Sequence, residues 1–321
     1  MENCMITDKI LDSSKYVVDN SKHVKINTQK LDEFSKNIKA ENVEHWLKSS
    51  PIDINKFSLN QRVNFLLIMH SIGFSYWGIP KWAIEYKGRL FDGSYGMVVA
   101  LFKAIENNYP ILNYDYLANI SENDFSKILA GNVQIPLFAE RLKIIREMGN
   151  IVNERFEGDF MNVLSEVNSD VDLLNIIIDN FPSFNDKSNY KDKEILFYKR
   201  AQLLVADIFQ VMPEQRFGIQ NLRNLTACAD YKIPQILRHF GILEYSLELA
   251  DMIDNKIELK KSSEEEVEIR ANMIYAIEVM KEFLRDKFED INSIMIDDQL
   301  WILSQTYKCN NPYHLIRTTS Y

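Results

Sequence analysis

The chain has 321 residues, of which 46% are hydrophobic and 26% charged, and these ordinary globular values exclude a largely disordered chain. Only 10 glycines and 8 prolines are present, too few for an all-β sandwich or propeller, which needs a turn every ~8–12 residues. With 46 acidic and 37 basic residues the net charge is −9, so the chain lacks the broad basic face that a nucleic-acid polymer requires.

The N-terminal region shows no recognisable targeting signal. Residues 1–15 lack the basic start and apolar core of a signal peptide, and the longest apolar run, residues 65–69, is far shorter than the ~20 residues that span a bilayer. Cys4, Cys228 and Cys309 form no CxxC pair and are too scattered for a disulfide framework or a zinc cluster. We therefore expect a cytoplasmic protein without membrane association.

Apolar residues recur at helical spacing through most of the chain. The segment 136–154 begins with Pro136, which suits the first turn of a helix. The segment 197–212 is apolar nearly all round, as expected of a central buried helix. Ser263 with Glu266 three residues later is a capping-box pattern. The patterns predict helices over residues 60–73, 95–108, 136–154, 197–212 and 263–286, and another that starts near Pro234.

Residues 82–93 break the helical period. Two short β-prone runs are joined there at Lys87-Gly88, which predicts a small hairpin. The sequence therefore predicts an all-α fold class, mainly helical with one small β-hairpin. We expect a single domain over residues 1–321, with an N-terminal helical segment, residues 1–60, packed on the core.

Three charged residues lie in or beside the apolar segment 200–207. Arg200 and Asp207 are seven positions apart and share a helix face, whereas Lys199 points about 100° away from Arg200. A charge in so apolar a helix must be paired or face a cavity, because burying it alone is costly. The pattern indicates either a structural ion pair between Arg200 and Asp207 or part of a binding site.

Asp230 lies between the apolar run 225–229 and the helix expected near Pro234. A carboxylate at this place commonly caps the following helix. Alternatively, it is presented into a pocket as a catalytic group.

Two further acidic clusters precede apolar or aromatic residues. Acids at 264–268 suit a helix N-terminus, and Glu266 with Arg270 makes a good i,i+4 pair. Asp297 and Asp298 precede a Leu-Trp pair, and their ordinary interpretation is a solvated helix start.

Several common catalytic motifs are missing. The sequence contains no GxGxxG, GxxxxGK[ST], HExxH or GxSxG, and its five histidines show no metal-ligand spacing. Nucleotide-cofactor enzymes of the common folds and zinc hydrolases are therefore disfavoured, and carboxylate chemistry is what remains.

Three segments carry a specific resemblance to a known family: FYKRAQ (197–202), ADYKIPQ (229–235) and EVEIR (266–270). With the other matching stretches, they show that the chain resembles the queuosine salvage protein family, the queuosine 5′-phosphate N-glycosylase/hydrolases. The resemblance covers almost the full chain, through residues 13–26, 73–77, 86–93, 135–149, 181–184, 197–207, 229–246, 265–271, 291–301 and 313–321.

This resemblance implies cleavage of the N-glycosidic bond of queuosine 5′-phosphate, with release of queuine for reuse in tRNA modification. It also implies a fold similar to that of helical DNA glycosylases and no metal or organic cofactor. By the same resemblance Asp230 is the catalytic carboxylate, Lys199 a pocket residue and Asp297 a contact to the base.

The chain departs from the family where the base is recognised. Cys228 stands where the family usually has a Phe that stacks on the base, so Trp77, Phe74 or Tyr231 would have to fill the gap. Asp298 stands where an aromatic residue often follows the first acid, and a histidine that contacts the ligand in relatives has His45 as its candidate equivalent.

The residue types suit the reaction. A carboxylate can stabilise the positive charge that builds on C1′ of the ribose, attack it or activate water. Asp297 and Asp298 suit the cationic amine and diol of the queuine arm. The 5′-phosphate needs cations, for which Lys199 and Arg200 are candidates and His239 a weaker one.

The main hypothesis is a monomeric N-ribosyl hydrolase that acts on a free modified nucleotide. The alternatives are a helical protein that binds queuine or a nucleotide without catalysis, and a base-excision type glycosylase. Retention of Asp230 favours an enzyme, and the acidic net charge disfavours duplex binding.

Overall fold

The computed structural model describes residues 5–38, 45–212 and 221–321. These residues are mainly helical, which confirms the predicted fold class. The α-helices are α1 (Ile6–Asn20), α2 (Thr28–Asn37), α3 (Leu59–Ser71), α4 (Gly93–Glu106), α5 (Tyr114–Ala118), α6 (Glu122–Ile128), α7 (Phe138–Arg155), α8 (Asp170–Asn180), α9 (Lys199–Val211), α10 (Lys232–His239), α11 (Leu247–Asp254), α12 (Glu264–Leu284) and α13 (Ser293–Thr306). Short 3₁₀ helices are η2 (Trp46–Ser49), η3 (Ile54–Lys56), η4 (Phe160–Ser165) and η5 (Pro182–Phe184).

The five predicted helices are confirmed as α3, α4, α7, α9 and α12, with ends within two residues of the predicted ones. Helices α7 and α9 start later than predicted because the residues before them, Leu137 and Tyr198, are left-handed, with φ of 54° and 48°. Pro136 therefore lies before α7 and not in its first turn. The helix expected near Pro234 is α10.

The predicted hairpin is confirmed as the antiparallel pair β2 (Ala83–Tyr86) and β3 (Arg89–Asp92). Its two turn residues, Lys87 and Gly88, both have positive φ, as the tight primed turns of hairpins require.

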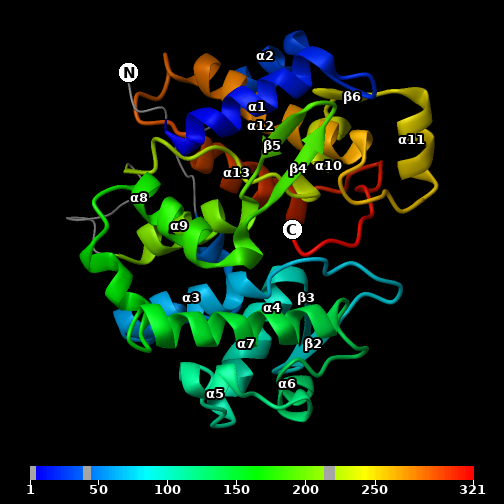
Figure 1. The fold of residues 1–321 in the computed structure, drawn as a ribbon. Helices are drawn as coiled ribbons and strands as arrows, with labels where there is room; N and C mark the ends of the chain where they lie inside the picture. Colours follow the sequence, from blue (N-terminus) through cyan, green and yellow to red (C-terminus); the bar gives the residue numbers. More distant parts are fainter. Residues whose placement is uncertain (1–4, 39–44, 213–220) are drawn as a thin grey trace.

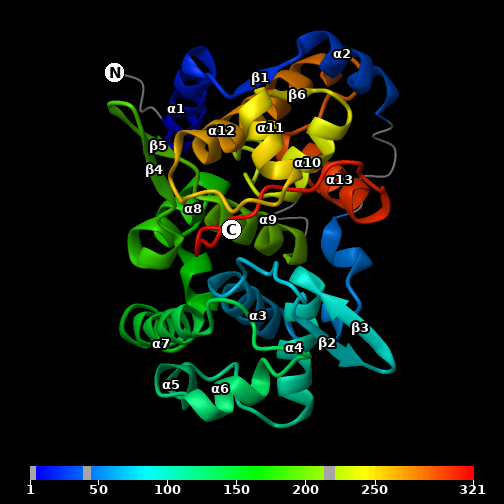
Figure 2. The ribbon, with the colours of Figure 1, turned by 90° about the vertical axis from the view of Figure 1, so that its right-hand side faces the viewer.

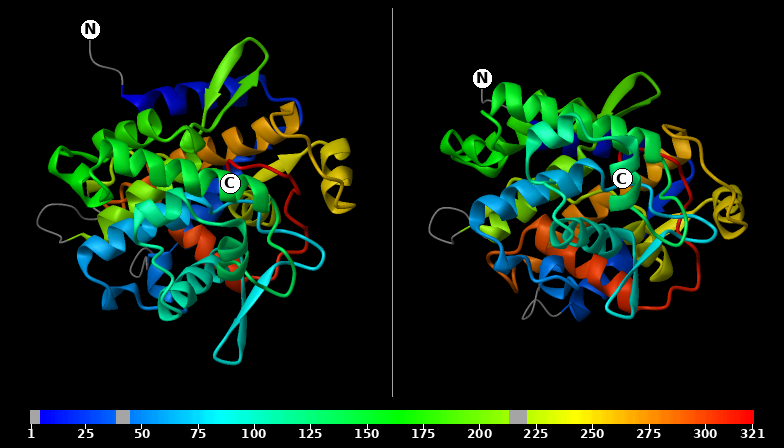
Figure 3. Two further views of the ribbon diagram at one scale, coloured as in Figure 1. Left: turned by 60° about the horizontal axis from the view of Figure 1, so that its bottom comes forward. Right: turned by 90° about the horizontal axis from the view of Figure 1, so that it is seen from below.

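The described residues contain more β-structure than the one small hairpin that the sequence predicts. Two more antiparallel pairs occur, β4 (Lys187–Tyr190) with β5 (Lys193–Leu196), and β1 (Val24–Ile26) with β6 (Leu243–Tyr245). The first is largely polar, and the second joins three-residue strands from distant parts of the chain. Neither therefore shows a strand period in the sequence. Figure 3 shows the β2–β3 and β4–β5 hairpins projecting on opposite sides of the helical body.

The helices form two groups (Figures 1 and 2). One contains α3–α7 with the β2–β3 hairpin. The other contains α1, α2 and α10–α13, with the long helix α12 packed against α1, α2, α10 and α13. Helix α9 packs against α3, and the C-terminal segment runs between the two groups.

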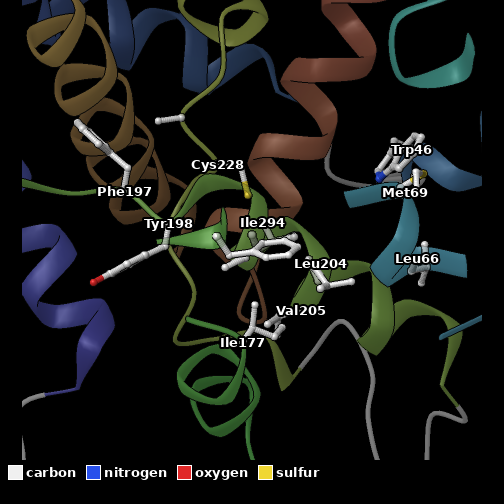
Figure 4. Close-up of a cluster of buried hydrophobic side chains, with 14 of the residues drawn as sticks. Trp46, Leu66, Met69, Ile177, Phe197, Tyr198, Leu204, Val205, Cys228 and Ile294 are labelled. Carbon is white, nitrogen blue, oxygen red and sulfur yellow. The ribbon is translucent and has the colours of Figure 1, made fainter. Parts of the chain in front are cut away.

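One continuous set of buried apolar side chains joins the two groups (part of it in Figure 4). None of the described helices is both long enough and apolar enough to pass through a lipid bilayer.

Candidate active site

A pocket lies where the two groups of helices meet. Its walls come from α3, the β2–β3 hairpin and the start of α4 on one side, and from α9, α10, α13 and the C-terminal segment on the other. Seven of the eleven predicted site residues line it: Asp230, Lys199, Asp297, Asp298, Cys228, Tyr231 and Trp77. The other four, Phe74, Arg200, His239 and His45, are not part of its lining.

Asp230 both caps a helix and faces the pocket. Its Oδ1 accepts the backbone N–H groups of Lys232 and Ile233, each at 2.9 Å, at the start of α10. No described residue donates a hydrogen bond to Oδ2. The two interpretations of Asp230 drawn from the sequence are therefore compatible, because one oxygen holds the helix and the other is left for a ligand.

Burial raises the pKa of the Asp230 carboxyl above its usual value, and the nearby charge of Lys199 opposes part of that rise. Lys199 is the first residue of α9, and its backbone N–H donates to Asp186 at 3.3 Å. Among the described residues no carboxylate lies within 4 Å of its ammonium nitrogen. Lys199 thus supplies the pocket with a positive charge that favours ionised Asp230.

Asp297 and Asp298 are buried in the middle of α13, with 5% and 3% of their surface exposed. The alternative of a solvated helix start is wrong, because α13 already begins at Ser293. Asp297 Oδ2 accepts the backbone N–H of Cys228 at 2.8 Å. Burial and the charges of Asp230 and Asp298 raise the pKa of Asp297 well above its usual range.

Asp298 is the less satisfied of the two acids. Its Oδ2 has no hydrogen-bond partner among the described residues and lies 3.8 Å from His45 Nε2. Burial raises its pKa to about 7, against the opposing effect of His45.

A buried polar layer lies behind Asp298. Asp207 accepts a hydrogen bond from Trp46 Nε1 at 2.9 Å, and its oxygens lie 2.9 Å from His45 Nε2 and 2.6 Å from His70 Nε2. Burial alone would raise the pKa of Asp207, but His70 and His45 bring it down to about 2. His45 therefore lies behind the pocket lining, against Asp207 and 3.8 Å from Asp298.

Arg200 has a structural role. Its guanidinium donates to the carbonyls of His70 and Ser71 at 2.7 and 2.8 Å, and also to the carbonyl of Ser183. The alternative of an ion pair between Arg200 and Asp207 is thus wrong. Arg200 is hydrogen-bonded to carbonyl groups at the end of α3, whereas Asp207 is paired with His45 and His70.

Phe74 and His239 also lie apart from the pocket lining. Phe74 is fully buried and packs against the guanidinium groups of Arg141 and Arg200. His239, at the end of α10, accepts the N–H of Asn310 at 3.3 Å and packs on the ring of Tyr307.

Three aromatic side chains that the sequence analysis did not propose as site residues line one side of the pocket. The rings of Trp46, Tyr95 and Trp301 contact one another, with centroid distances of 5.6 to 6.1 Å. They come from η2, α4 and α13, so no local motif in the sequence signals them. Their planes are inclined to one another by 37° to 81°, and together they form an apolar wall close to Asp298.

The predicted aromatic candidates lie elsewhere on the lining. Tyr231 packs on Tyr313, with ring centroids 4.8 Å apart. Trp77 donates its indole N–H to the carbonyl of Ile316 at 2.6 Å and is covered by Arg317. Cys228 is buried and belongs to the apolar cluster in Figure 4.

A second group of buried charges lies next to the pocket and is fully paired. Arg270 donates to Asp186 at 2.5 and 3.1 Å and to Glu266 at 3.4 Å, which confirms the predicted Glu266–Arg270 pair. Its Nε donates to the carbonyl of Ala229, the residue before Asp230, at 3.3 Å. Tyr321 donates to Glu266 at 3.0 Å.

The predicted capping box at α12 is confirmed only in part. Ser263 caps the helix, but the Glu266 carboxylate accepts the N–H of Ser262 and not that of Ser263.

The described residues contain one group that could hold a metal ion, His23, Glu264 and Glu268. It is not part of the pocket lining. Glu268 is already occupied there, since it accepts the backbone N–H groups of Lys22, His23 and Val24. The pocket itself offers carboxylates, the ammonium groups of Lys81, Lys199 and Lys232, and aromatic faces, which suit a polar, charged ligand with a flat ring.

Comparisons with known proteins point to one family. A family model described as "Queuosine salvage protein" matches residues 54–321. A protein of Sphaerobacter thermophilus named "Queuosine 5′-phosphate N-glycosylase/hydrolase" is 38% identical over 261 residues, which cover 80% of this chain and 81% of that protein. Proteins of the same name from Bos taurus and Mus musculus are 30% and 29% identical, with 81% and 97% of this chain covered and 81% and 98% of theirs.

Proposed function

This chain belongs to the queuosine salvage protein family, and we propose that it hydrolyses the N-glycosidic bond of queuosine 5′-phosphate and releases queuine. The observation that carries the proposal is Asp230, whose Oδ2 is free of described donors and faces a pocket that also holds Lys199. The comparisons support a glycosidic-bond hydrolase, and the pocket supplies the groups that this reaction needs.

Asp230 is proposed as the catalytic carboxylate. As the C1′–N bond breaks, positive charge builds on C1′ and on the ring oxygen of the ribose, and a nearby carboxylate lowers the energy of that state. Its Oδ1 is fixed by two backbone N–H groups, so the direction of Oδ2 is set before the substrate binds. Lys199 helps to keep the carboxyl ionised against its burial.

The departing base needs a hydrogen-bond donor. In a 7-deazapurine the ring atom that is usually protonated in purines is a carbon, so help must come through other edges of the base. Asp297 is a suitable donor because burial, Asp230 and Asp298 all favour its protonated form. Water adds to C1′, and the base leaves with a proton on the nitrogen that carried the ribose.

The part of the pocket around Asp298 suits the cyclopentenediol arm of the base. The arm carries a secondary amine that is cationic at neutral pH, and Asp298 offers it an oxygen without a described hydrogen-bond partner. Trp46, Tyr95 and Trp301 border the same region and can pack against the flat parts of the ligand.

The test is direct. Purified protein is incubated with queuosine 5′-phosphate, and free queuine and ribose 5-phosphate are sought by mass spectrometry. We expect both products in equal amounts. Binding of the substrate without cleavage would replace the proposal with a non-catalytic binding protein, and release of bases from damaged duplex DNA would replace it with a base-excision glycosylase.

A further inference from the structure

The C-terminal segment, residues 313–321, is hydrogen-bonded to both groups of helices. On one side, the carbonyl of Tyr321 accepts the backbone N–H of Ser75, in the loop that follows α3, at 2.9 Å. On the other side, the carbonyl of Leu315 accepts the backbone N–H of Leu259, which lies between α11 and α12, at 2.8 Å. Because both groups are held by the same short segment, its position affects how the two walls of the pocket face each other.

The hydroxyl of Tyr321 belongs to the buried group of charges behind the pocket. It donates to Glu266 Oε1 at 3.0 Å and lies 3.1 Å from His314 Nε2. Burial and the charge of Arg270 lower the pKa of His314 to about 3, so its imidazole is neutral at neutral pH. Since the only hydroxyl proton goes to Glu266, the neutral ring donates from Nε2 to the Tyr321 oxygen. Neither Glu266 nor His314 lines the pocket, so this hydroxyl is directed behind the lining.

Tyr321 contacts the cation of this group in two ways. The Arg270 guanidinium lies 4.3 Å from the centre of the Tyr321 ring and 3.9 Å from that of Phe197. Glu266 Oε1, which accepts the Tyr321 hydroxyl, also accepts Arg270 at 3.4 Å. The place of the guanidinium therefore depends on the ring of Tyr321 directly and on its hydroxyl through Glu266.

Hydrogen bonds lead from Arg270 to the backbone of two pocket residues. Arg270 Nε donates to the carbonyl of Ala229, the residue before Asp230, at 3.3 Å. The guanidinium also donates to Asp186, which accepts the backbone N–H of Lys199 at 3.3 Å. A displaced guanidinium would therefore displace the backbone next to Asp230 and that of Lys199 together. A shift of about 1 Å in a reacting group can cost on the order of 10²-fold in rate.

We propose that Tyr321 is a positioning residue for the cleavage reaction. Through the Glu266–Arg270 pair, its hydroxyl sets where the backbone of Asp230 lies. The C-terminal segment thus couples the contact between the two groups of helices to the geometry of the reacting carboxylate. The inference rests on the proposed function, since the reaction is the one proposed above.

A second buried tyrosine provides a matched control. Tyr190, in β4, donates its hydroxyl to Glu268 Oε1 at 2.7 Å, and Glu268 lies on α12 two positions after Glu266. Tyr190 and Tyr321 are 1% and 3% exposed. Glu268 accepts the backbone N–H groups of residues 22–24 and does not line the pocket. Tyr190→Phe therefore removes the same kind of hydrogen bond from the same helix at a place away from the pocket.

Kinetics with queuosine 5′-phosphate give the first readout. Tyr321→Phe keeps the ring but removes the partner that Glu266 and His314 share. We expect kcat to fall about 10-fold to 100-fold, the scale of a misplaced reacting group, while KM changes less than about 3-fold. Tyr190→Phe should keep the wild-type kcat even where its melting temperature falls as far. A wild-type kcat in Tyr321→Phe, or an equal loss of kcat in both variants, would overturn the proposal.

Hydrogen exchange tests the inference without catalysis. The backbone N–H groups of residues 232–233 donate to Asp230 Oδ1, so their exchange rates report how firmly this carboxylate is held. We expect Tyr321→Phe to raise these rates about 10-fold, whereas Tyr190→Phe should raise those of residues 22–24 instead. Unchanged rates at residues 232–233 in Tyr321→Phe would overturn the positioning role even in an active enzyme. The expected rates in a protein that cleaves nothing would overturn only the proposed function.

His314→Leu replaces Tyr321→Phe if the latter does not fold. It removes the other hydrogen bond of the hydroxyl and leaves the ring of Tyr321 against Arg270. We expect the same pattern at a smaller size, with a lower kcat, little change in KM and faster exchange at residues 232–233. If kcat and these exchange rates both stay at the wild-type values, the proposal is overturned.

Discussion

Two groups of buried carboxylates lie side by side in this molecule and differ in their partners. Asp186 and Glu266 share the guanidinium of Arg270, with donor–acceptor distances from 2.5 to 3.4 Å. The pocket acids Asp230, Asp297 and Asp298 have no guanidinium, and the nearest ammonium forms no ion pair with them within the described residues.

The paired group has a structural role, whereas the pocket acids are available for binding and proton transfer. The paired group holds the backbone of the unpaired one, since Arg270 Nε donates to the carbonyl of Ala229 and Asp186 accepts the N–H of Lys199. Burial raises the pKa of Glu266 as well, but Arg270 opposes that rise. Burial raises the pKa values of Asp297 and Asp298 with no guanidinium to oppose it, which leaves them able to bind a cation or carry a proton. Each prediction below tests one side of this comparison.

The largest effect is expected on the paired side. Arg270→Met leaves Asp186 and Glu266 buried without a cation, which should lower the free energy of unfolding by about 3–5 kcal/mol. Urea unfolding measures it. Arg238→Met is the matched control, because Arg238 makes a bidentate pair with the half-exposed Asp254 and should cost about 1 kcal/mol or less. Equal costs would mean that burial does not distinguish the two pairs.

The pocket side should respond in the opposite way. Asp230→Asn keeps an oxygen to cap α10 but removes the charge, so kcat should fall at least ~10²-fold, as when one electrostatic stabiliser of a transition state is lost. The free energy of unfolding should stay the same or rise, since a buried charge is removed. Near-normal turnover would exclude Asp230 from the mechanism, and strong destabilisation would make it a structural cap.

A third test uses pH. The pKa of Asp298 is about 7 in the folded chain, above its ordinary value near 4, so between pH 4 and 7 the folded state holds a proton that the unfolded state has lost. The stability linked to this proton is therefore present at low pH and is lost as pH rises through about 7, with a slope of up to ~1.4 kcal/mol per pH unit.

The imidazole of His45, 3.8 Å from Asp298, adds to this loss of stability as the pH rises. Asp298 itself raises the pKa of His45, whose extra proton is also lost on the alkaline side. Asp207 and Asp297 are the other acidic groups that interact electrostatically with the Asp298 carboxyl. Asp298→Asn should therefore flatten the fall of unfolding free energy between pH 5.5 and 7.5, measured by urea titration at each pH. The same slope in both proteins would show that Asp298 is ionised throughout this range.

Elements and pairs formed by residues close in the chain can be predicted from the sequence, whereas contacts between distant segments cannot. The helices α3 and α12, the hairpin turn at Lys87-Gly88 and the Glu266–Arg270 pair depend on residues close in the chain, so local patterns predict them. The partners of Arg200 and Asp207 come from α3 and η2, and no spacing within α9 indicates them. Of the pocket, the residue pattern indicates Asp230 and Lys199 as candidates and the family resemblance gives their roles, whereas Lys81 and Trp301 come together there only through the fold.

The smallest effect concerns Cys228, where the pocket meets the apolar core. Cys228→Phe adds a ring beside Asp230, and stacking of a base on an aromatic face is worth ~1–3 kcal/mol. The residue is almost fully buried and packs in the cluster of Figure 4. Overpacking of this cluster by the larger ring would lower the free energy of unfolding by ~1–3 kcal/mol. We expect the variant to fold and to bind queuine about 5-fold more tightly, mainly through slower release, measured by stopped-flow and by melting temperature.

The direction of the new ring decides the result. The backbone N–H of Cys228 is held by Asp297, so the main chain cannot move away without breaking that bond, and the ring must turn either into the pocket or into the core. A ring in the pocket slows queuine release and leaves the melting temperature nearly unchanged. A ring in the core lowers the melting temperature and leaves binding as it was, which would show that apolar neighbours already fill the space that the family's usual Phe would take.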